Sequence, residues 1–410
     1  PSSMPRRPSS NVAEPTDEPN PRRYLPRRAA SRGVTYASSP DSSEGSPVRQ
    51  PKGRSKGNAG RGADFTYDPS SPYSSPFRRP VRQLFHELDR RPARKHARQP
   101  DSYTPTLSIP CTKTLEEYHD GPLTSAAISH SGLVLATSSR DKTARLYSLS
   151  TDSFLYELKG HNGTVRSVAF SPDDRLLVTS SDDGNAELWD TESFKNVQTL
   201  GKPAAKGHSR WVNSASFSFD GKRIVTGSPV DKTAKIWDVA DGRCIATFTA
   251  GEGVFDARFA PNGETFVTAS RSGVAEIWEA RAKGASVRKL SHGEWVRAAC
   301  FSPDGAMVAT VSEDGCTKFW DVGLGECEKE LEGHEGCVFD VDFSWVSTAG
   351  KDETAKVWSF ETGKLVDTLS GHGGQVFSAK FSADGSMLST ASFGRSAKVW
   401  NTKELKCGAQ

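Results

Sequence analysis

An aromatic residue recurs about every 42 positions through most of this chain. It stands at Tyr147, Trp189, Trp237, Trp278, Trp320, Trp358 and Trp400, with spacings of 42, 48, 41, 42, 38 and 42 residues. The residues before it repeat one phrase, as in DKTAKIWD, DDGNAELWD and EDGCTKFWD. Self-similarity at a fixed period of this length is the signature of a repeat architecture, so we expect seven copies of one structural unit.

Each unit has the pattern of four short strands. In residues 160–200 the runs TVRSVAF, RLLVTS, NAELWD and NVQTL are rich in β-branched and apolar residues, and turn sequences such as SPDD and SDDG separate them. Four antiparallel strands in a repeat of about 40 residues are typical of a propeller blade and not of a helical repeat. The sequence therefore predicts an all-β fold.

A Gly-His pair near the start of a unit and a Trp-Asp pair near its end complete the pattern. With these motifs the chain resembles the WD-repeat β-propeller family over residues of about 110 to 410. The resemblance implies a ring of seven blades. Since CTKTLEEYHDG from Cys111 is similar to the fourth strand of a blade, we expect this N-terminal strand to complete blade seven, although Lys406 to Gln410 could compete for the same place.

The family carries a structural tetrad of His, Ser/Thr, Asp and Trp, hydrogen-bonded across one blade. The resemblance assigns it here to three sets: His161, Ser181, Asp183 and Trp189; His208, Ser228, Asp231 and Trp237; and His292, Ser312, Asp314 and Trp320. The other four blades depart from the pattern, with Tyr147 in blade one, Gly350 in place of the hydroxyl in blade six, Gly394 in place of the acid in blade seven, and Ala250 and Ser272 in blade four. Although His, Ser and Asp together suggest a catalytic triad, these histidines belong to separate blades, so a structural role is the better interpretation.

The first hundred residues differ in composition from the rest of the chain. They contain 20 Lys/Arg against 9 Asp/Glu, a net charge of +11, while the remainder contains 33 against 41, a net charge of −8. They also contain 16 of the 24 prolines and none of the nine tryptophans. A segment this polar cannot bury enough apolar surface to offset the entropy of ordering, so we predict a disordered tail over 1–105 and the propeller over 106–410. Because the chain begins at Pro1 and not at Met, whether residues precede it is left open.

The sequence contains no common enzyme signature: there is no phosphate-binding loop, no GxSxG and no HExxH. Seven scattered cysteines without a CxxC pair favour reduced thiols over a zinc site or a disulfide framework. With no apolar run of membrane-spanning length and no secretory signal, we expect a non-enzymatic intracellular protein, cytoplasmic or nuclear, without cofactor, metal or membrane contact.

In WD-repeat propellers two sets of side chains face the narrow end of the ring, and the resemblance maps both sets onto this chain. The residues after the Gly-His turn are Thr124, Arg166 with Thr164, Asn213 with Trp211, Phe255, Arg297 with Trp295, Phe339, and Phe377 with Gln375. The residues before the tetrad acid are Arg140, Asp182, Val230, Arg271, Glu313, Lys351 and Phe393. Aromatic and Arg side chains are enriched at interface anchors, and we therefore predict ten partner-binding residues: Arg140, Arg166, Trp211, Phe255, Arg271, Trp295, Arg297, Phe339, Phe377 and Phe393. For any single Phe, packing between blades is an equally good explanation.

The tail has features of a regulatory segment. SPVR at Ser46 and SPFR at Ser75 have the form of sites for proline-directed cyclin-dependent kinases, and RQLF at Arg82 resembles a cyclin-docking motif, which predicts a kinase contact. PVRQLFHELDRR places four apolar residues on one face of a short helix. The +11 charge leaves a second hypothesis open, in which the tail binds nucleic acid and the protein is a ribonucleoprotein or chromatin component.

Overall fold

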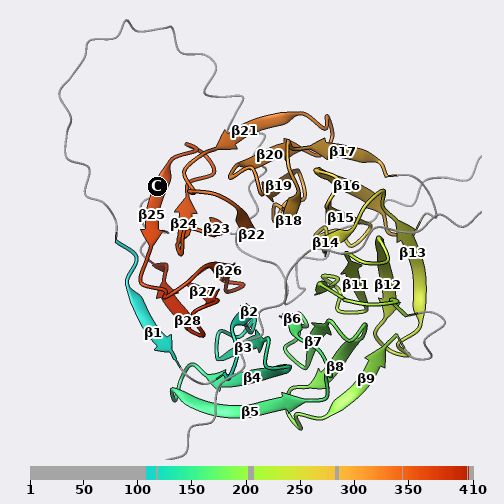
Figure 1. Ribbon diagram of the computed structural model, residues 1–410, viewed down its shortest axis with the longest axis vertical. Coiled ribbons are helices and arrows are strands. Elements are labelled where there is room, and N and C mark those ends of the chain that lie inside the picture. The colour runs from blue at the N-terminus through green and yellow to red at the C-terminus, as the bar shows by residue number, and fades with distance from the viewer. Residues whose placement is uncertain are drawn as a thin grey trace, which may run out of the picture. The chain divides into compact units, whose positions relative to one another are not determined.

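The fold is known from a computed structural model, which describes residues 108–116, 119–201, 207–281, 286–343, 345–403 and 405. These residues form 28 strands in seven four-stranded antiparallel sheets. The sheets stand around a central channel like the blades of a propeller (Figure 1). The predicted all-β, seven-bladed propeller is thereby confirmed.

Each of the first six blades is a continuous stretch of chain whose four strands run from the channel outward. Blade one contains β2 (Leu123–Ile128), β3 (Val134–Ser139), β4 (Thr143–Ser148) and β5 (Ser153–Lys159). Blade two contains β6 (Val165–Phe170), β7 (Leu176–Ser181), β8 (Ala186–Asp190) and β9 (Asn196–Leu200). Blade three contains β10 (Ser214–Phe217), β11 (Arg223–Ser228), β12 (Thr233–Asp238) and β13 (Cys244–Thr249).

The next three blades follow the same order. Blade four contains β14 (Val254–Phe259), β15 (Thr265–Ser270), β16 (Val274–Glu279) and β17 (Arg288–Ser291). Blade five contains β18 (Val296–Phe301), β19 (Met307–Ser312), β20 (Thr317–Asp321) and β21 (Cys327–Leu331). Blade six contains β22 (Val338–Asp342), β23 (Val346–Gly350), β24 (Ala355–Trp358) and β25 (Leu365–Leu369).

Blade seven combines both ends of the described chain. Its inner strands are β26 (Val376–Phe381), β27 (Met387–Ser392) and β28 (Ala397–Asn401), and its outer strand is β1 (Cys111–Leu115). β1 pairs antiparallel with β28, with Cys111 opposite Trp400 and Leu115 opposite Ala397 (Figure 1). The expectation that the N-terminal strand completes this blade is therefore confirmed.

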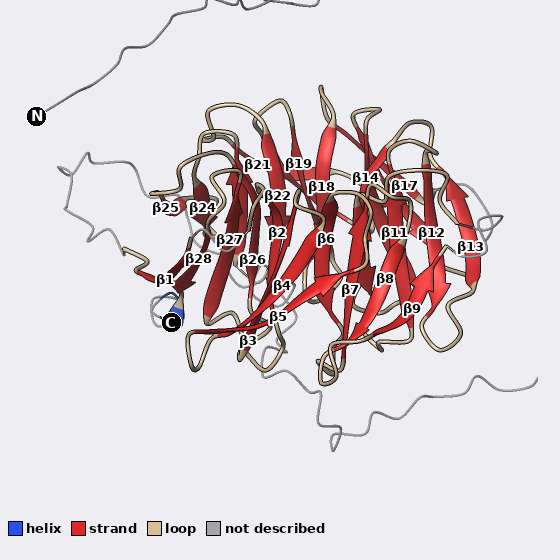
Figure 2. Cartoon of the chain, turned by 60° about the horizontal axis from the view of Figure 1, so that its bottom comes forward, coloured by secondary structure: helices blue, strands red, loops and turns tan. Residues whose placement is uncertain are grey.

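The hydrophobic core lies between the blades. The strands stand nearly side by side around the ring in Figure 2, and each apolar cluster draws on two adjacent sheets. One cluster joins Leu146 and Leu158 of blade one to Val168 and Trp189 of blade two. A blade therefore buries its apolar faces only when both neighbours are present, which is why a ring is the stable arrangement.

The predictions for the tail concern residues outside those that the structure describes. This applies to the 1–105 boundary, to Ser46 and Ser75, to the RQLF motif and to the helical pattern that follows Pro80. They remain predictions.

Candidate functional site

A β-bulge in the innermost strand directs the candidate side chains toward the channel. In six blades the pairing register of this strand shifts by one residue near its start, for example between Val254 and Asp256, which leaves Phe255 out of the ladder. A bulge residue is freed from pairing and its side chain is re-aimed. The bulge residues are Thr124, Arg166, Phe255, Arg297, Phe339 and Phe377, six of the positions predicted for the narrow face.

The tetrads hold the loops that carry the other residues of this face. The residue that supplies the tetrad hydroxyl is not the one predicted. In blade two, Nδ1 of His161 donates to Asp183 at 2.9 Å, and Nε2 lies 2.8 Å from Oγ1 of Thr179. The indole N–H of Trp189 donates to the same Thr179 oxygen at 2.9 Å. The hydroxyl oxygen of Ser181 instead accepts a hydrogen bond from the backbone N–H of Asp183.

The assignment of Ser181, Ser228 and Ser312 to the tetrads is therefore wrong. In blades three and five the hydroxyl belongs to Thr226 and Thr310, which hold the same contacts to histidine and tryptophan. The physical reason is strand geometry. Residues two apart in a strand share one face, so both positions point the same way, and only the threonine lies level with the indole of the next strand.

Blade six has a complete tetrad despite its glycine. Thr348 joins His334 and Trp358, and Asp352 accepts from the histidine at 2.9 Å. Gly350 occupies the position of the capping serine, not that of the tetrad hydroxyl. The expectation that blade six lacks the hydroxyl is wrong for the same reason as in blades two, three and five.

The charges of the tetrads depend on burial and on the acid. Burial alone would raise the pKa of Asp183, but the hydrogen bond and the charge of His161 and the backbone N–H groups of Asn162 and Asn185 together outweigh it and lower that pKa to about 2. In blade seven Ser396 replaces the acid beside His372, with Oγ 2.9 Å from Nδ1. Burial, together with the charge of Lys398, lowers the pKa of His372 to about 4. His372 is therefore uncharged at neutral pH.

Four of the ten predicted partner-binding residues form one group over blades six, seven and one. The guanidinium of Arg140 lies 5.1 Å from the ring centre of Phe393. Phe393 meets Phe377 edge to face at 6.1 Å, and Phe377 meets Phe339 at 5.0 Å. Phe393 is 43% exposed, so this group presents aromatic surface to solvent.

The other six residues form two further groups. Arg166 lies 5.6 Å from the ring of Trp211, which is 47% exposed. Over blades four and five, Arg271 lies 4.1 Å from the ring of Trp295, and Arg297 lies 4.5 Å from that of Phe255. The two aromatic rings are 5.8 Å apart. Every one of the ten residues thus contacts another member of the set.

The set has an inner and an outer part. Arg166, Phe255, Arg297, Phe339 and Phe377 line the channel, a cavity of about 470 Å³, together with Thr124 and Asn213. The remaining five do not line it; they lie on the loops and turns that precede or join the strands. We use the name rim for fourteen positions, two in each blade: the bulge residue of the innermost strand, or Asn213 in blade three, and the residue just before the position of the tetrad acid. The rim consists of Thr124, Arg166, Asn213, Phe255, Arg297, Phe339 and Phe377, and of Arg140, Asp182, Val230, Arg271, Glu313, Lys351 and Phe393.

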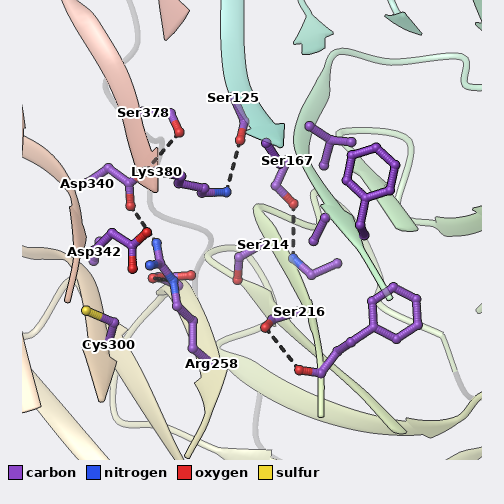
Figure 3. A pocket seen from close by; sticks show the side chains of 18 of the residues that line it. Ser125, Ser167, Ser214, Ser216, Arg258, Cys300, Asp340, Asp342, Ser378 and Lys380 are labelled. Atoms are coloured by element: carbon purple, nitrogen blue, oxygen red, sulfur yellow. Dashed lines mark hydrogen bonds and ion pairs between the residues drawn. The ribbon is translucent and has the colours of Figure 1, made fainter. Parts of the chain in front are cut away.

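A charged layer lies deeper in the channel. Nη2 of Arg258 in blade four pairs with Asp340 in blade six at 2.5 Å, and its Nη1 donates to the carbonyl of Val341 at 2.8 Å. Its Nε contacts Asp256 at 2.9 Å. Figure 3 shows Arg258 directed toward Asp340, with Cys300 of blade five beside it. The arginine therefore joins two blades that are not neighbours.

The layer continues to the blades that close the ring. Asp340 accepts the hydroxyl of Ser378 at 2.9 Å, and Nζ of Lys380 donates to Ser125 of blade one at 3.2 Å (Figure 3). Burial lowers the pKa of Lys380, and burial raises that of Asp256. Burial would also lower the pKa of Arg258, but Asp256 and Asp340 raise it far above its usual value. Arg258 therefore keeps its positive charge between the carboxyl groups of Asp256 and Asp340.

Sequence reasoning missed this layer. Its signal is present in the inner-strand runs VFDARF, VFDVDF and VFSAKF, where other blades have serine, alanine or cysteine at the charged positions. Charged residues in a buried strand indicate partners across the fold.

The described residues contain no group of three or more His, Cys, Asp or Glu side chains able to hold a metal ion. They also contain no helix that is long and apolar enough to span a membrane.

Comparison with known proteins supports this description. The family model of the WD domain, G-beta repeat, matches residues 109–148, 152–190, 195–238, 242–279, 284–321, 325–359 and 363–401. The chain is similar to apoptotic protease-activating factor 1 of Homo sapiens (26% identity over 39% of this chain and 13% of that protein) and to WD repeat-containing protein 37 of Mus musculus (33% over 34% and 27%). It is also similar to the ribosome biogenesis protein BOP1 homolog of Aedes aegypti, with 37% identity over 20% of this chain and 9% of that protein.

The similarity thus spans less than a third of the length of these curated relatives. Seven matched repeats cover two thirds of the sequence and correspond to the seven blades. The chain belongs to the WD-repeat family of β-propellers.

Proposed function

We propose that this protein is a non-enzymatic scaffold that holds a partner peptide or loop on the narrow face of its propeller. WD-repeat propellers generally act as protein-interaction scaffolds, and this is the coarse function that the family carries. The observation that supports the narrow face is the contact of all ten predicted residues with one another in three Arg–aromatic groups around the channel mouth.

Aromatic side chains suit this role because they provide large contact areas at low entropic cost, and Arg adds a planar group with several hydrogen-bond donors. Binding energy is usually concentrated in a few such anchors near the centre of an interface. Trp211 and Phe393 expose enough ring surface to bury a partner side chain. Arg271 and Arg140 add charged donors beside those rings.

The test compares two variants of the full chain in a cross-linking pull-down. One variant carries Trp295→Ala, Arg297→Ala and Phe339→Ala on the narrow face. The other carries Phe219→Ala, which removes a 63% exposed side chain from the β10–β11 turn at the opposite end of the channel. We expect the first variant to lose partners that the wild type and the second variant retain. Its affinity for a partner should fall about 100-fold if two of its three replaced side chains are anchors.

Thermal unfolding of both variants checks that they remain folded. If a folded triple variant captures the same proteins as the wild type, the narrow face is not the binding site. The hypothesis that the tail binds a kinase or nucleic acid concerns residues outside the described ones, and a parallel pull-down with a chain lacking residues 1–105 tests it. Location in the cytoplasm or the nucleus, and phosphorylation of Ser46 and Ser75, remain part of this proposal.

A further inference from the structure

The arginines of the rim fall into two classes by their partners. Arg166 contacts both carboxylate oxygens of Asp182, at 2.7 and 2.8 Å, and Arg297 pairs with Glu313. Each pair joins a bulge residue to the pre-acid residue of its own blade. These two arginines are neutralised within the protein, so they shape the channel mouth without offering it a net charge.

Arg140 and Arg271 pair with no carboxylate in the part of the chain that the structure describes. Among the described residues, the side-chain partner of Arg140 is the ring of Phe393, and that of Arg271 is the ring of Trp295. Both arginines are exposed, as is Lys351 of blade six, which likewise pairs with no described carboxylate. A guanidinium that lies over an aromatic face keeps the N–H groups at its edge free, and this edge binds a carboxylate in two-pronged fashion.

The charge of the rim is opposite to that of the rest of the propeller. Its fourteen positions contain five cationic and two acidic side chains, a net charge of +3, whereas residues 101–410 together carry −8. A positive patch around a concave mouth attracts anionic groups. The N-terminal hundred residues carry +11, so their overall charge disfavours them as ligands of this face.

Apolar surface lies beside one of the free arginines. Phe339, Phe377 and Phe393 form a continuous edge-to-face cluster that ends at Arg140. A ligand that pairs with Arg140 therefore places its next side chains against aromatic rings. Free cations that stand singly in blades one, four and six do not form the continuous stripe that a phosphate backbone follows.

Resting on the proposed function, we infer that the narrow face selects an acidic peptide segment of its partner. One carboxylate pairs with Arg140 while a neighbouring apolar side chain lies on Phe377 and Phe393. A second carboxylate pairs with Arg271 above Trp295. Arg140 and Arg271 are specificity-determining residues, and Arg166 and Arg297 are not.

The experiment selects binders for the full chain from a displayed library of random twelve-residue peptides. We expect the enriched peptides to be acidic with Leu or Phe close to the carboxylates. Their affinity should fall about ten-fold or more for each of Arg140→Glu and Arg271→Glu, because a hydrogen bond between charged groups is lost. The matched control is Arg243→Glu, a charge reversal in the β12–β13 turn, which should leave the affinity unchanged. Arg140→Lys with Arg271→Lys keeps the charge but removes the fork, and should give an intermediate loss.

Two outcomes separate this inference from the function on which it rests. If the selected peptides are neutral or basic but still lose binding in Phe393→Ala, the narrow face binds peptides and the acidic specificity is wrong. If binding is insensitive to both Phe393→Ala and the arginine reversals, the narrow-face function fails as well. A labelled twenty-nucleotide single strand forms the third arm. The strand could bind more tightly than any selected peptide and lose this binding in the double variant Arg140→Glu, Arg271→Glu. That result would show that the narrow face binds nucleic acid and not an acidic peptide.

Discussion

The hydroxyl oxygen of Thr179 accepts a hydrogen bond from the indole of Trp189 and is also hydrogen-bonded to the ring of His161. Thr179 should therefore contribute more to stability than Ser181, two residues later. Replacing Thr179 with Val leaves the indole N–H of Trp189 and Nε2 of His161 unsatisfied. We expect Thr179→Val to lower the free energy of unfolding by about 2–4 kcal/mol, since each buried unsatisfied group costs about 1–3 kcal/mol. Ser181→Ala, which loses one backbone contact, should cost about 1 kcal/mol or less. Urea unfolding measures both, and equal losses would contradict the tetrad described for blade two.

Gly350 is the exception among residues that are serine in the other six blades. Because the other six blades have serine at this position, a comparison of the repeats suggests that Gly350→Ser should stabilise blade six. Yet a Cβ at this position would lie 2.7 Å from Oδ1 of Asp352 and would collide with the ring of His334. We expect Gly350→Ser to destabilise the protein by about 1–3 kcal/mol, as overpacking does. Gly293→Ser is the control because its Cβ would meet open space, and a melting temperature raised by Gly350→Ser would refute the prediction.

At the scale of elements, β1 is the strand whose loss should open the ring. It covers the outer edge of β28, its Thr112 donates to the carbonyl of Val399, and Ile109 just before it is buried with Leu369 and Trp400. Removing residues 1–116 would expose that edge and apolar surface together, and unpaired edges promote aggregation. We expect this truncation to lower the melting temperature markedly and to cause association, as followed by light scattering, whereas removal of residues 1–107 should do neither. Equal behaviour of the two truncations would show that β1 does not close the fold.

The strands and the closure by β1 were predictable, because turn residues and a strict repeat define where strands begin and end. The bulges were not, since a bulge is a property of the register between two strands and leaves no fixed residue at Phe255 or Arg297. Thr179 and Ser181 could not be distinguished because both stand on one face of β7. The narrow-face residues were predicted by position, but the neutral and free classes of arginine emerged only from the contacts of Asp182 and Glu313.

Across the whole molecule, Arg258 connects blades four and six past the small Ala298 and Cys300 of blade five. Replacing it with Met leaves two nearly buried carboxylates without their counter-charge. We expect Arg258→Met to cost about 3–5 kcal/mol, the range for breaking one side of a buried ion pair. Arg223→Met is the control because that side chain loses only a bond to the Gly263 carbonyl and a ring contact with Phe259.

Calorimetry measures the loss, and adding Asp340→Asn to Arg258→Met should restore part of it. A loss no larger than that of Arg223→Met would mean that the charged layer does not tie the ring together.

The pairing of β1 with β28 has a consequence for the order of synthesis. About 280 residues separate the two strands, and β1 leaves the ribosome first. At roughly 5–20 residues per second, β1 waits on the order of 15–60 s for the partner that covers it. During that time six blades can form in sequence while β1 remains unpaired. The nascent chain is therefore an open arc that becomes a ring only in its last seconds, which makes the newly made protein a natural client for chaperones that shield strand edges.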